Sequence, residues 1–145
     1  MLIQHILNNK GTEVFHIGPK QTVYEAIEKM ASKDIGALLV MEDDKLLGII
    51  TETDYRIKVI LKGRASKTTN VEKIMSTGLY CVKPNEKVET CMALMTDRKV
   101  RQLPVLEDDR VKGVVSIGDL VKAVISKQQG EIHNLKDYIT GTYPG

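Results

Sequence analysis

The sequence has no tryptophan and only one phenylalanine among its 145 residues, so a hydrophobic core has to be built from aliphatic side chains. No apolar run approaches the roughly 18 residues that a membrane-spanning helix needs. The first residues, MLIQHIL, also lack the basic start, the long apolar stretch and the cleavage site of a signal peptide. We therefore expect a cytoplasmic protein without a membrane partner.

Cysteine and net charge are equally scarce. Cys81 and Cys91 have neither a partner pair nor clustered histidines, so neither a disulfide framework nor a zinc site is expected. The formal net charge of +2 is too small to indicate nucleic acid as the main partner. The three histidines are scattered and stand beside no nucleophile. These absences argue against an enzyme, and we expect no catalytic residue and no metal site.

What the sequence does contain is an internal repeat. Segment 17–60 aligns without a gap on segment 82–125, so that Gly48 matches Gly113 and Asp54 matches Asp119. A coincidental match of this length and chemical quality is implausible, which makes the segment a duplication. The matching acidic triplets 42–44 and 107–109 are typical of solvated hairpin turns rather than of metal ligands.

Each copy has the hydrophobic pattern of a β-α-β-β-α unit. Apolar residues recur at helical spacing from Val23 to Met30, and short apolar runs on both sides of the acidic triplet are typical of a hairpin. In order, the expected elements are strands 14–17 and 80–82, helices 23–30 and 88–95, strands 37–41 and 103–106, strands 46–50 and 111–115, and closing helices 54–61 and 119–125. A leading helix over 3–7 has an apolar echo at 71–75.

The repeat also sets the expected domain organisation. We expect a first repeat with its leading helix over 1–63, a polar basic linker over 64–70, a second repeat with its leading helix over 71–128, and a C-terminal helix and tail over 129–145. A unit this small buries too little surface to be stable alone. The expected fold class is therefore α/β (α+β), with the two repeats packed face to face as a pseudo-two-fold pair.

A motif closes the second hairpin of each copy. Both copies carry Gly-x-x-[Ser/Thr]-x-x-Asp, at 48–54 and 113–119. Two such motifs at matching places in a β-α-β-β-α repeat resemble a pair of cystathionine-β-synthase (CBS) domains, and segments 91–95 and 100–105 are similar to bacterial stand-alone CBS-pair proteins. The resemblance implies a regulatory module that binds AMP, ADP, ATP, NAD or S-adenosylmethionine, forms a homodimer and signals to another protein in trans.

The chemistry of these motif residues suits adenosine. The carboxylates of Asp54 and Asp119 are placed to accept charge-assisted hydrogen bonds from both ribose hydroxyls. Thr51 and Ser116 put a hydroxyl and the free N–H groups of a helix start beside them, which favours an anion. Strand residues around these motifs are candidates for a thin adenine slot, with Arg101 and Lys58 near the phosphates. The candidate slot residues are Ile35, Gly36, Ala37, Leu38, Val100, Arg101, Gln102 and Leu103.

Other interpretations fit the same residues. [Ser/Thr]-x-x-Asp before a helix is also a capping box, and the two roles are compatible. Thr53 and Gln102 stand where the family often has arginine and histidine, which removes phosphate contacts and makes the second motif the stronger candidate. Two other classes of protein remain open: a ligand-free structural dimerisation module, and a nucleic-acid-binding module that uses the basic linker.

Overall fold

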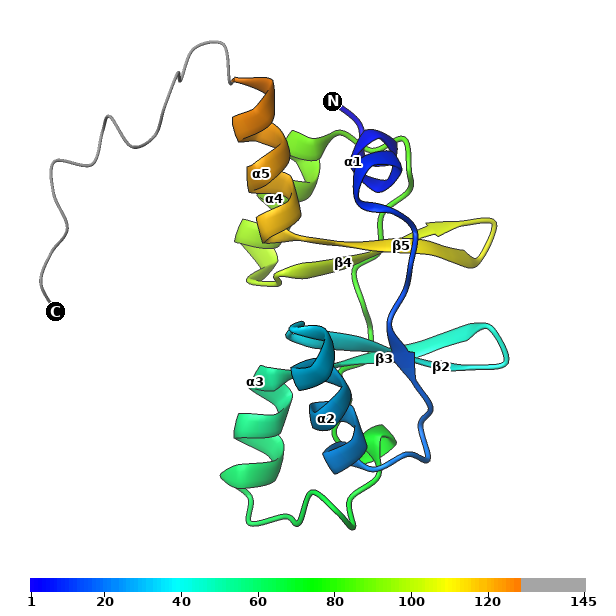
Figure 1. The fold of residues 1–145 in the computed structure, drawn as a ribbon, viewed down its shortest axis with the longest axis vertical. Helices are drawn as coiled ribbons and strands as arrows, with labels where there is room; N and C mark the ends of the chain where they lie inside the picture. The colour runs from blue at the N-terminus through cyan, green and yellow to red at the C-terminus, as the bar shows by residue number, and fades with distance from the viewer. Residues whose placement is uncertain (129–145) are drawn as a thin grey trace, which may run out of the picture.

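The computed structural model describes residues 1–128, which form two stacked α/β halves. In Figure 1 the two small sheets face each other across the middle of the molecule, and the longer helices of each half lie on the outer side of its sheet. This arrangement confirms the expected fold class of two packed repeats. The C-terminal helix and tail expected over 129–145 lie outside the described residues.

The first half contains a three-stranded sheet in the order β1-β2-β3. Strand β1 is parallel to β2, and β2 pairs with β3 in antiparallel register, with Val40 opposite Gly48. Helix α2 packs against β2. The elements are β1 (His16–Ile17), α2 (Val23–Lys33), β2 (Ala37–Glu42), β3 (Lys45–Thr51), α3 (Glu52–Asp54) and η1, a π-helix (Tyr55–Ile60).

The second half repeats this order around a two-stranded antiparallel sheet, in which Val105 lies opposite Gly113. In place of a first strand it has a single parallel bridge from Val82 to Val105. The strand expected over 80–82 is therefore wrong, because the backbone pairs with β4 at one residue only. The elements are α4 (Val88–Arg98), β4 (Gln102–Glu107), β5 (Arg110–Ser116) and α5 (Ile117–Lys127).

The acidic triplets form the hairpin turns that the sequence predicts. Asp43 and Asp44 have φ values of 50° and 63°, and Asp108 and Asp109 have 53° and 62°. Positive φ at both central residues matches a type I′ turn, whose twist suits a two-residue hairpin, and aspartate tolerates this conformation. Among residues 1–128, no group of three or more His, Cys, Asp or Glu side chains is placed to hold a metal ion.

The leading segments pack on the opposite half from the one that follows them in sequence. Helix α1 (Ile3–Lys10) buries Ile3 and Leu7 in the core of the second half. Val71 and Ile74 are buried in the core of the first half. The backbone bonds repeat too: Ile3 N donates to Glu86 O, and Val71 N donates to Gln21 O. Each half is thus completed by a segment that comes from outside its own repeat.

This packing explains the glycine at the start of each motif. A Cβ atom on Gly48 would lie 2.6 Å from the carbonyl oxygen of Ser76, and one on Gly113 would lie 2.7 Å from Cδ2 of Leu7. Both positions are where a leading segment crosses the sheet, so the close approach leaves no room for a side chain.

Three helix predictions need correction. The helix expected over 71–75 is a single 3-10 turn, η2 (Val71–Lys73), because residues beyond it extend and pair with β3, where Ser76 and Ile49 exchange backbone hydrogen bonds. The closing helices begin two residues earlier than predicted, at Glu52 rather than Asp54 and at Ile117 rather than Asp119, since Thr51 and Ser116 are their caps. The first of them continues as the π-helix η1. Among residues 1–128, none of the helices has both the length and the apolar composition that crossing a bilayer requires.

Candidate functional site

The second motif joins the end of β5 to the start of α5. Ser116 Oγ accepts a hydrogen bond from Asp119 N at 3.0 Å, and Asp119 Oδ2 accepts one from Ser116 N at 2.8 Å. This reciprocal pair is a complete capping box, which fixes the carboxylate at the beginning of the helix. Residues 1–128 donate hydrogen bonds to Oδ2 of Asp119 but none to Oδ1.

A lysine from the other end of the chain completes this motif. Lys10, the last residue of α1, places its Nζ 2.7 Å from Oδ2 of Asp119 and 2.8 Å from the carbonyl oxygen of Val114. Partial burial raises the pKa of Asp119, but the hydrogen bonds from Lys10 and Ser116 outweigh it, so the pKa lies below its ordinary value. Asp119 is therefore a carboxylate at neutral pH, and two donated hydrogen bonds orient it, one from Ser116 N and one from the Lys10 ammonium.

The motif opens into a cavity of about 390 Å³ that is shared by both halves. One wall carries Ser116 and Asp119, and the facing wall is the start of β2 in the first half. A volume in the range of small-molecule pockets and a mixture of aliphatic and polar lining fit a small organic ligand. The lining residues are Lys10, Glu13, Phe15, Asp34, Ile35, Gly36, Ala37, Leu38, Leu39, Ile49, Gln102, Val114, Ser116 and Asp119.

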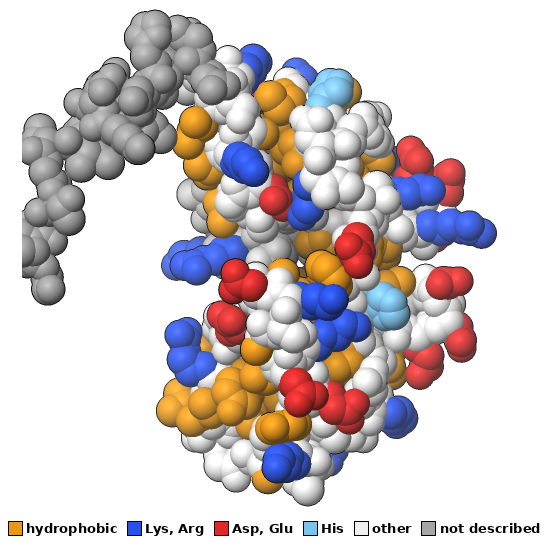
Figure 2. Space-filling view, viewed as in Figure 1, with side chains coloured by type: hydrophobic (Ala, Val, Ile, Leu, Met, Phe, Trp, Pro, Cys, Tyr) orange, Lys and Arg blue, Asp and Glu red, His pale blue; other side chains and the backbone are white. Residues whose placement is uncertain are grey.

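The waist between the two halves is strongly charged. Figure 2 shows side chains of both signs gathered around this middle zone, whereas larger apolar areas lie on the halves themselves. Lys33 from α2 lies 5.5 Å from the ring centre of Phe15, so a cation also stands beside the aromatic wall of the cavity. The cavity therefore presents both carboxylates and ammonium groups to an occupant.

The first motif is built differently. Asp54 Oδ2 accepts hydrogen bonds from the backbone N and the hydroxyl of Thr51, both at 3.0 Å. Its Oδ1 accepts one from Ser76 Oγ at 3.0 Å and lies 2.9 Å from Lys58 Nζ. The side chain of Asp54 is 7% exposed, compared with 24% for Asp119. Both oxygens of this carboxylate are thus occupied by protein donors.

The structure divides the candidate ligand residues into two groups. Ile35, Gly36, Ala37, Leu38, Gln102, Ser116 and Asp119 line the shared cavity. Thr51, Asp54 and Lys58 cluster instead at the first motif, and Leu103 is buried in the second core with Val100 packed against it. Arg101 accepts a backbone hydrogen bond from Ile117 through its carbonyl oxygen, and it does not line the cavity.

The sequence pattern does not predict Lys10, Glu13, Phe15 or Asp34 as cavity residues. The first three lie at the end of α1 and in the connection to β1, which crosses from one half to the other. The internal repeat does not predict that the chain crosses between the halves here, since it pairs each leading segment with the repeat that follows it in the sequence. Asp34, which caps α2 in the left-handed region at φ 54°, carries no motif of its own.

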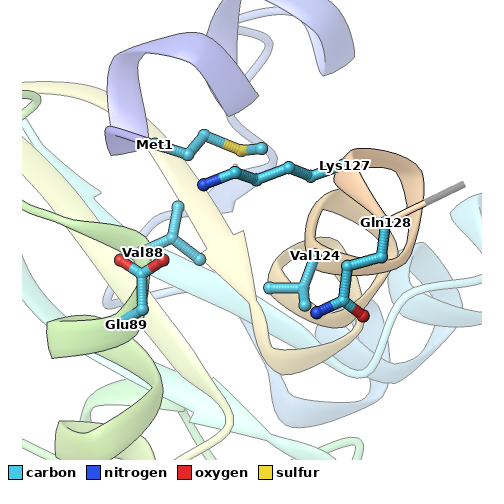
Figure 3. A pocket seen from close by; sticks show the side chains of 6 residues that line it. All are labelled: Met1, Val88, Glu89, Val124, Lys127 and Gln128. Carbon is cyan, nitrogen blue, oxygen red and sulfur yellow. The ribbon is translucent and has the colours of Figure 1, made fainter. Parts of the chain in front are cut away.

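A second cavity, of about 260 Å³, lies apart from both motifs (Figure 3). Met1, the start of α4 and the end of α5 line it, and Glu89 is its carboxylate. Hydrogen bonding to its own backbone N–H, followed by the nearby N-terminus and Lys127, lowers the pKa of Glu89. These are the contacts of a helix end with surrounding cations, and they form a solvated rim rather than a recognition site.

The sequence of the chain also defines the class of protein to which it belongs. The CBS domain family matches residues 10–59 and 71–126, one domain for each repeat. The chain therefore belongs to the CBS domain family and carries a pair of such domains. The resemblance seen in the two motifs is confirmed. Proteins made of CBS domains alone are generally ligand-binding regulatory modules rather than catalysts.

Individual relatives agree with this assignment. The mitochondrial CBS domain-containing protein CBSX3 of Arabidopsis thaliana is 45% identical over 127 residues, which is 84% of this chain and 62% of the plant protein. A CBS-domain protein of Burkholderia ambifaria is 45% identical with a TM-score of 0.85, over 89% of this chain and 97% of that one. The CBS domain pair of protein MJ0100, in complex with 5′-methylthioadenosine and S-adenosyl-L-methionine, shares the fold at 23% identity and a TM-score of 0.77, over 88% and 98% of the chains.

Proposed function

We propose that this protein is a regulatory module that binds an adenosine-containing ligand, with AMP, ADP, ATP and NAD as the candidates, and signals to a partner protein in trans. One observation carries the proposal: the Asp119 carboxylate faces a cavity of about 390 Å³ whose opposite wall is the segment Ile35–Leu39, which leads into β2. A carboxylate accepts hydrogen bonds from a ribose diol, while the small residues Gly36 and Ala37 at the start of β2 leave space for a flat ring.

Fold similarity supports the same ligand class. MJ0100 holds two adenosine compounds on this architecture, so a CBS pair has space for the adenosine group. Because the cavity is bounded by both halves, an occupant would contact both at once. A ligand that binds one packing of the halves better than another shifts the population between them, which is how the occupied state would be communicated.

The direct test is a thermal-shift and calorimetric panel of adenosine, AMP, ADP, ATP and NAD. A ligand that binds only the folded protein, at a hundred times its Kd, adds about 2.7 kcal/mol of stability. Asp119→Ala should weaken the best ligand by about tenfold or more, because it removes charge-assisted hydrogen bonds. Asp97→Ala, a change at an exposed helix residue, is the matched control. Melting curves that no adenosine compound shifts would refute the proposal.

A structural dimerisation module is the second candidate. Several large apolar side chains are exposed on the helices, and Figure 2 shows apolar surface over the first half, the lower one in this view. Such surface on a small protein is typical of an interface. We propose that a second copy covers these helices, and sedimentation would show a dimer with or without nucleotide. The exposed residues include Tyr24, Ile57, Ile60, Leu61, Val121 and Ile125.

The third interpretation, nucleic-acid binding through the basic linker, has less support. Lys67 in the linker packs its ammonium 4.9 Å from the ring centre of Tyr24, and Arg64 donates a hydrogen bond to the carbonyl oxygen of Lys58. These cations are engaged with their own surroundings. Binding to nucleic acid that weakens steeply with salt concentration would support this interpretation.

The cytoplasmic location of the protein stays a prediction.

A further inference from the structure

The two motifs share a sequence pattern, but their carboxylates differ in how many oxygen atoms already accept hydrogen bonds from the protein. Asp54 has Thr51, Ser76 and Lys58 distributed over both oxygens. Asp119 has its protein donors on Oδ2, while residues 1–128 leave Oδ1 without a hydrogen bond. A ribose diol binds a carboxylate only where acceptor capacity is left, or where a ligand donor replaces a protein donor.

Repeat-equivalent positions explain this difference. Lys58 stands one helical turn after Asp54, where its Nζ is 2.9 Å from Oδ1, but the equivalent residue after Asp119 is Ala123. Ser76 has no counterpart either, since the matching residue of the first leading segment is Asn8, whose side chain accepts a hydrogen bond from Gln4. The donors that fill Oδ1 in the first half are therefore missing from the second by sequence.

The donors around Asp54 also join separate segments. Lys58 Nζ donates to the carbonyl oxygen of Ile74 at 3.0 Å, and Ser76 Oγ donates to Asp54 at 3.0 Å. The π-helix η1 and the crossing segment 74–76 are thus tied together through one nearly buried carboxylate. A ligand hydroxyl at Asp54 would have to displace Ser76 or Lys58, which would leave a half-buried polar group without its partner.

From this geometry we propose that the two motifs have separate roles: Asp54 is a clasp that holds the crossing segment 74–76 to the first half, and the chain binds one adenosine ligand, at Ser116 and Asp119. The single ligand site rests on the proposed function, whereas the clasp does not, because it consists of contacts within the chain. Lys58 and Ser76 are positioning residues that act on Asp54.

The clasp is tested without ligand, by thermal unfolding of Asp54→Asn and its matched partner Asp119→Asn. Asparagine keeps the shape but loses the charge. We expect Asp54→Asn to lower the Tm by about 5 °C or more and Asp119→Asn to lower it by clearly less. Ser76→Ala should lower the Tm in the wild type but add little in the Asp54→Asn background, because the same contact is already weakened. Equal Tm losses, or additive effects of Ser76→Ala, would overturn the clasp.

The ligand count is tested by calorimetry with AMP and 5′-methylthioadenosine on the wild type, Ser76→Ala and Asp119→Asn. We expect one site per chain, unchanged in Ser76→Ala and lost or weakened about tenfold in Asp119→Asn. Two sites per chain, or one site that Asp119→Asn leaves intact, would overturn the single-site assignment. Absence of any binding by the wild type would overturn the proposed function and the site assignment together, while the unfolding result would still decide the clasp.

Discussion

Lys10 Nζ lies 2.7 Å from Asp119 Oδ2, although the two residues are 109 positions apart in the chain. The contact exists because α1 crosses to the second half and ends beside the start of α5. It places an ammonium group at the edge of the cavity and ties the leading helix to the residue that we expect to hold the ligand.

Lys10→Met should reduce stability at pH 7 by about 0.5 to 1 kcal/mol, a small value because both side chains are partly exposed. The pKa of Asp119 is held below its ordinary value in the folded protein, so its stabilising contribution is complete above the ordinary aspartate pKa of about 4. That contribution is lost as the pH falls through the lowered pKa. Urea unfolding of both proteins from pH 7 to pH 2 should show the difference disappear at the acid end; a difference that persists there would contradict the ion pair as its source.

Gly48→Ala should destabilise the protein by about 1 to 3 kcal/mol, because the new Cβ would meet the Ser76 carbonyl oxygen at 2.6 Å and Met75 Sδ at 2.9 Å. Gly113→Ala is the matched variant. Its Cβ would meet the end of the flexible Leu7 side chain, so we expect a smaller loss. Chemical denaturation measures both, and an equal or reversed order would show that the backbone of the crossing segment 74–76 yields more easily than the structure implies.

Only one of the two cysteines should react with a thiol reagent in the native protein. Cys91 has no exposed surface, and burial, with a smaller effect of Glu86, raises its pKa to about 11. Cys81 is exposed, although partial burial of its sulfur raises its pKa as well. A thiol reagent at pH 8 should therefore modify one thiol per chain in the native protein, and unfolding in urea should make the second thiol reactive. Fast modification of two native thiols would contradict the packing of Cys91.

Thr22→Ala should lower stability by about 1 kcal/mol, because Thr22 Oγ1 accepts the hydrogen bond of Glu25 N at the start of α2. The second copy supplies the control. Lys87 occupies the same position before α4 without a side-chain capping bond, so Lys87→Ala should change stability little. Thermal unfolding of the two variants, monitored by circular dichroism, compares them directly.

Much of this fold follows from local pattern. The helical spacing from Val23 to Met30, the paired apolar runs and the acidic turns predict α2, the hairpins and their connections, because these elements depend on nearby residues. The strand predicted over 80–82 is wrong for a reason that is not local: β1 pairs with β2 at two consecutive residues, whereas in the second half Val82 pairs with Val105 alone. A local hydrophobic pattern does not predict how many residues of a segment pair with a neighbouring strand.

The site was predictable only in part. Ser116, Asp119 and the run Ile35–Leu38 carry signals of motif, small residues and strand hydrophobicity, and the structure brings them to one cavity. The position of Lys10 beside Asp119 could not be predicted, because the repeat pattern assigns the leading helix to the half that follows it in the sequence. The hydrogen bonds that protein donors make to Asp54 could not be predicted either. They depend on Ser76 and Lys58 lying beside this carboxylate in the folded chain, whereas the sequence motif around Asp54 matches the one around Asp119.

The exchange of leading segments has a consequence for how the chain comes apart. With α1 seated in the later half and residues 71–76 seated in the earlier one, a cut in the linker would give two pieces that each lack part of their own interior. Neither piece should fold in isolation, yet a mixture of the two should reassemble, since every lost apolar surface is carried by the other piece. The two repeats are therefore not independent modules connected by a linker. Each half needs a segment from the other repeat to complete its hydrophobic core.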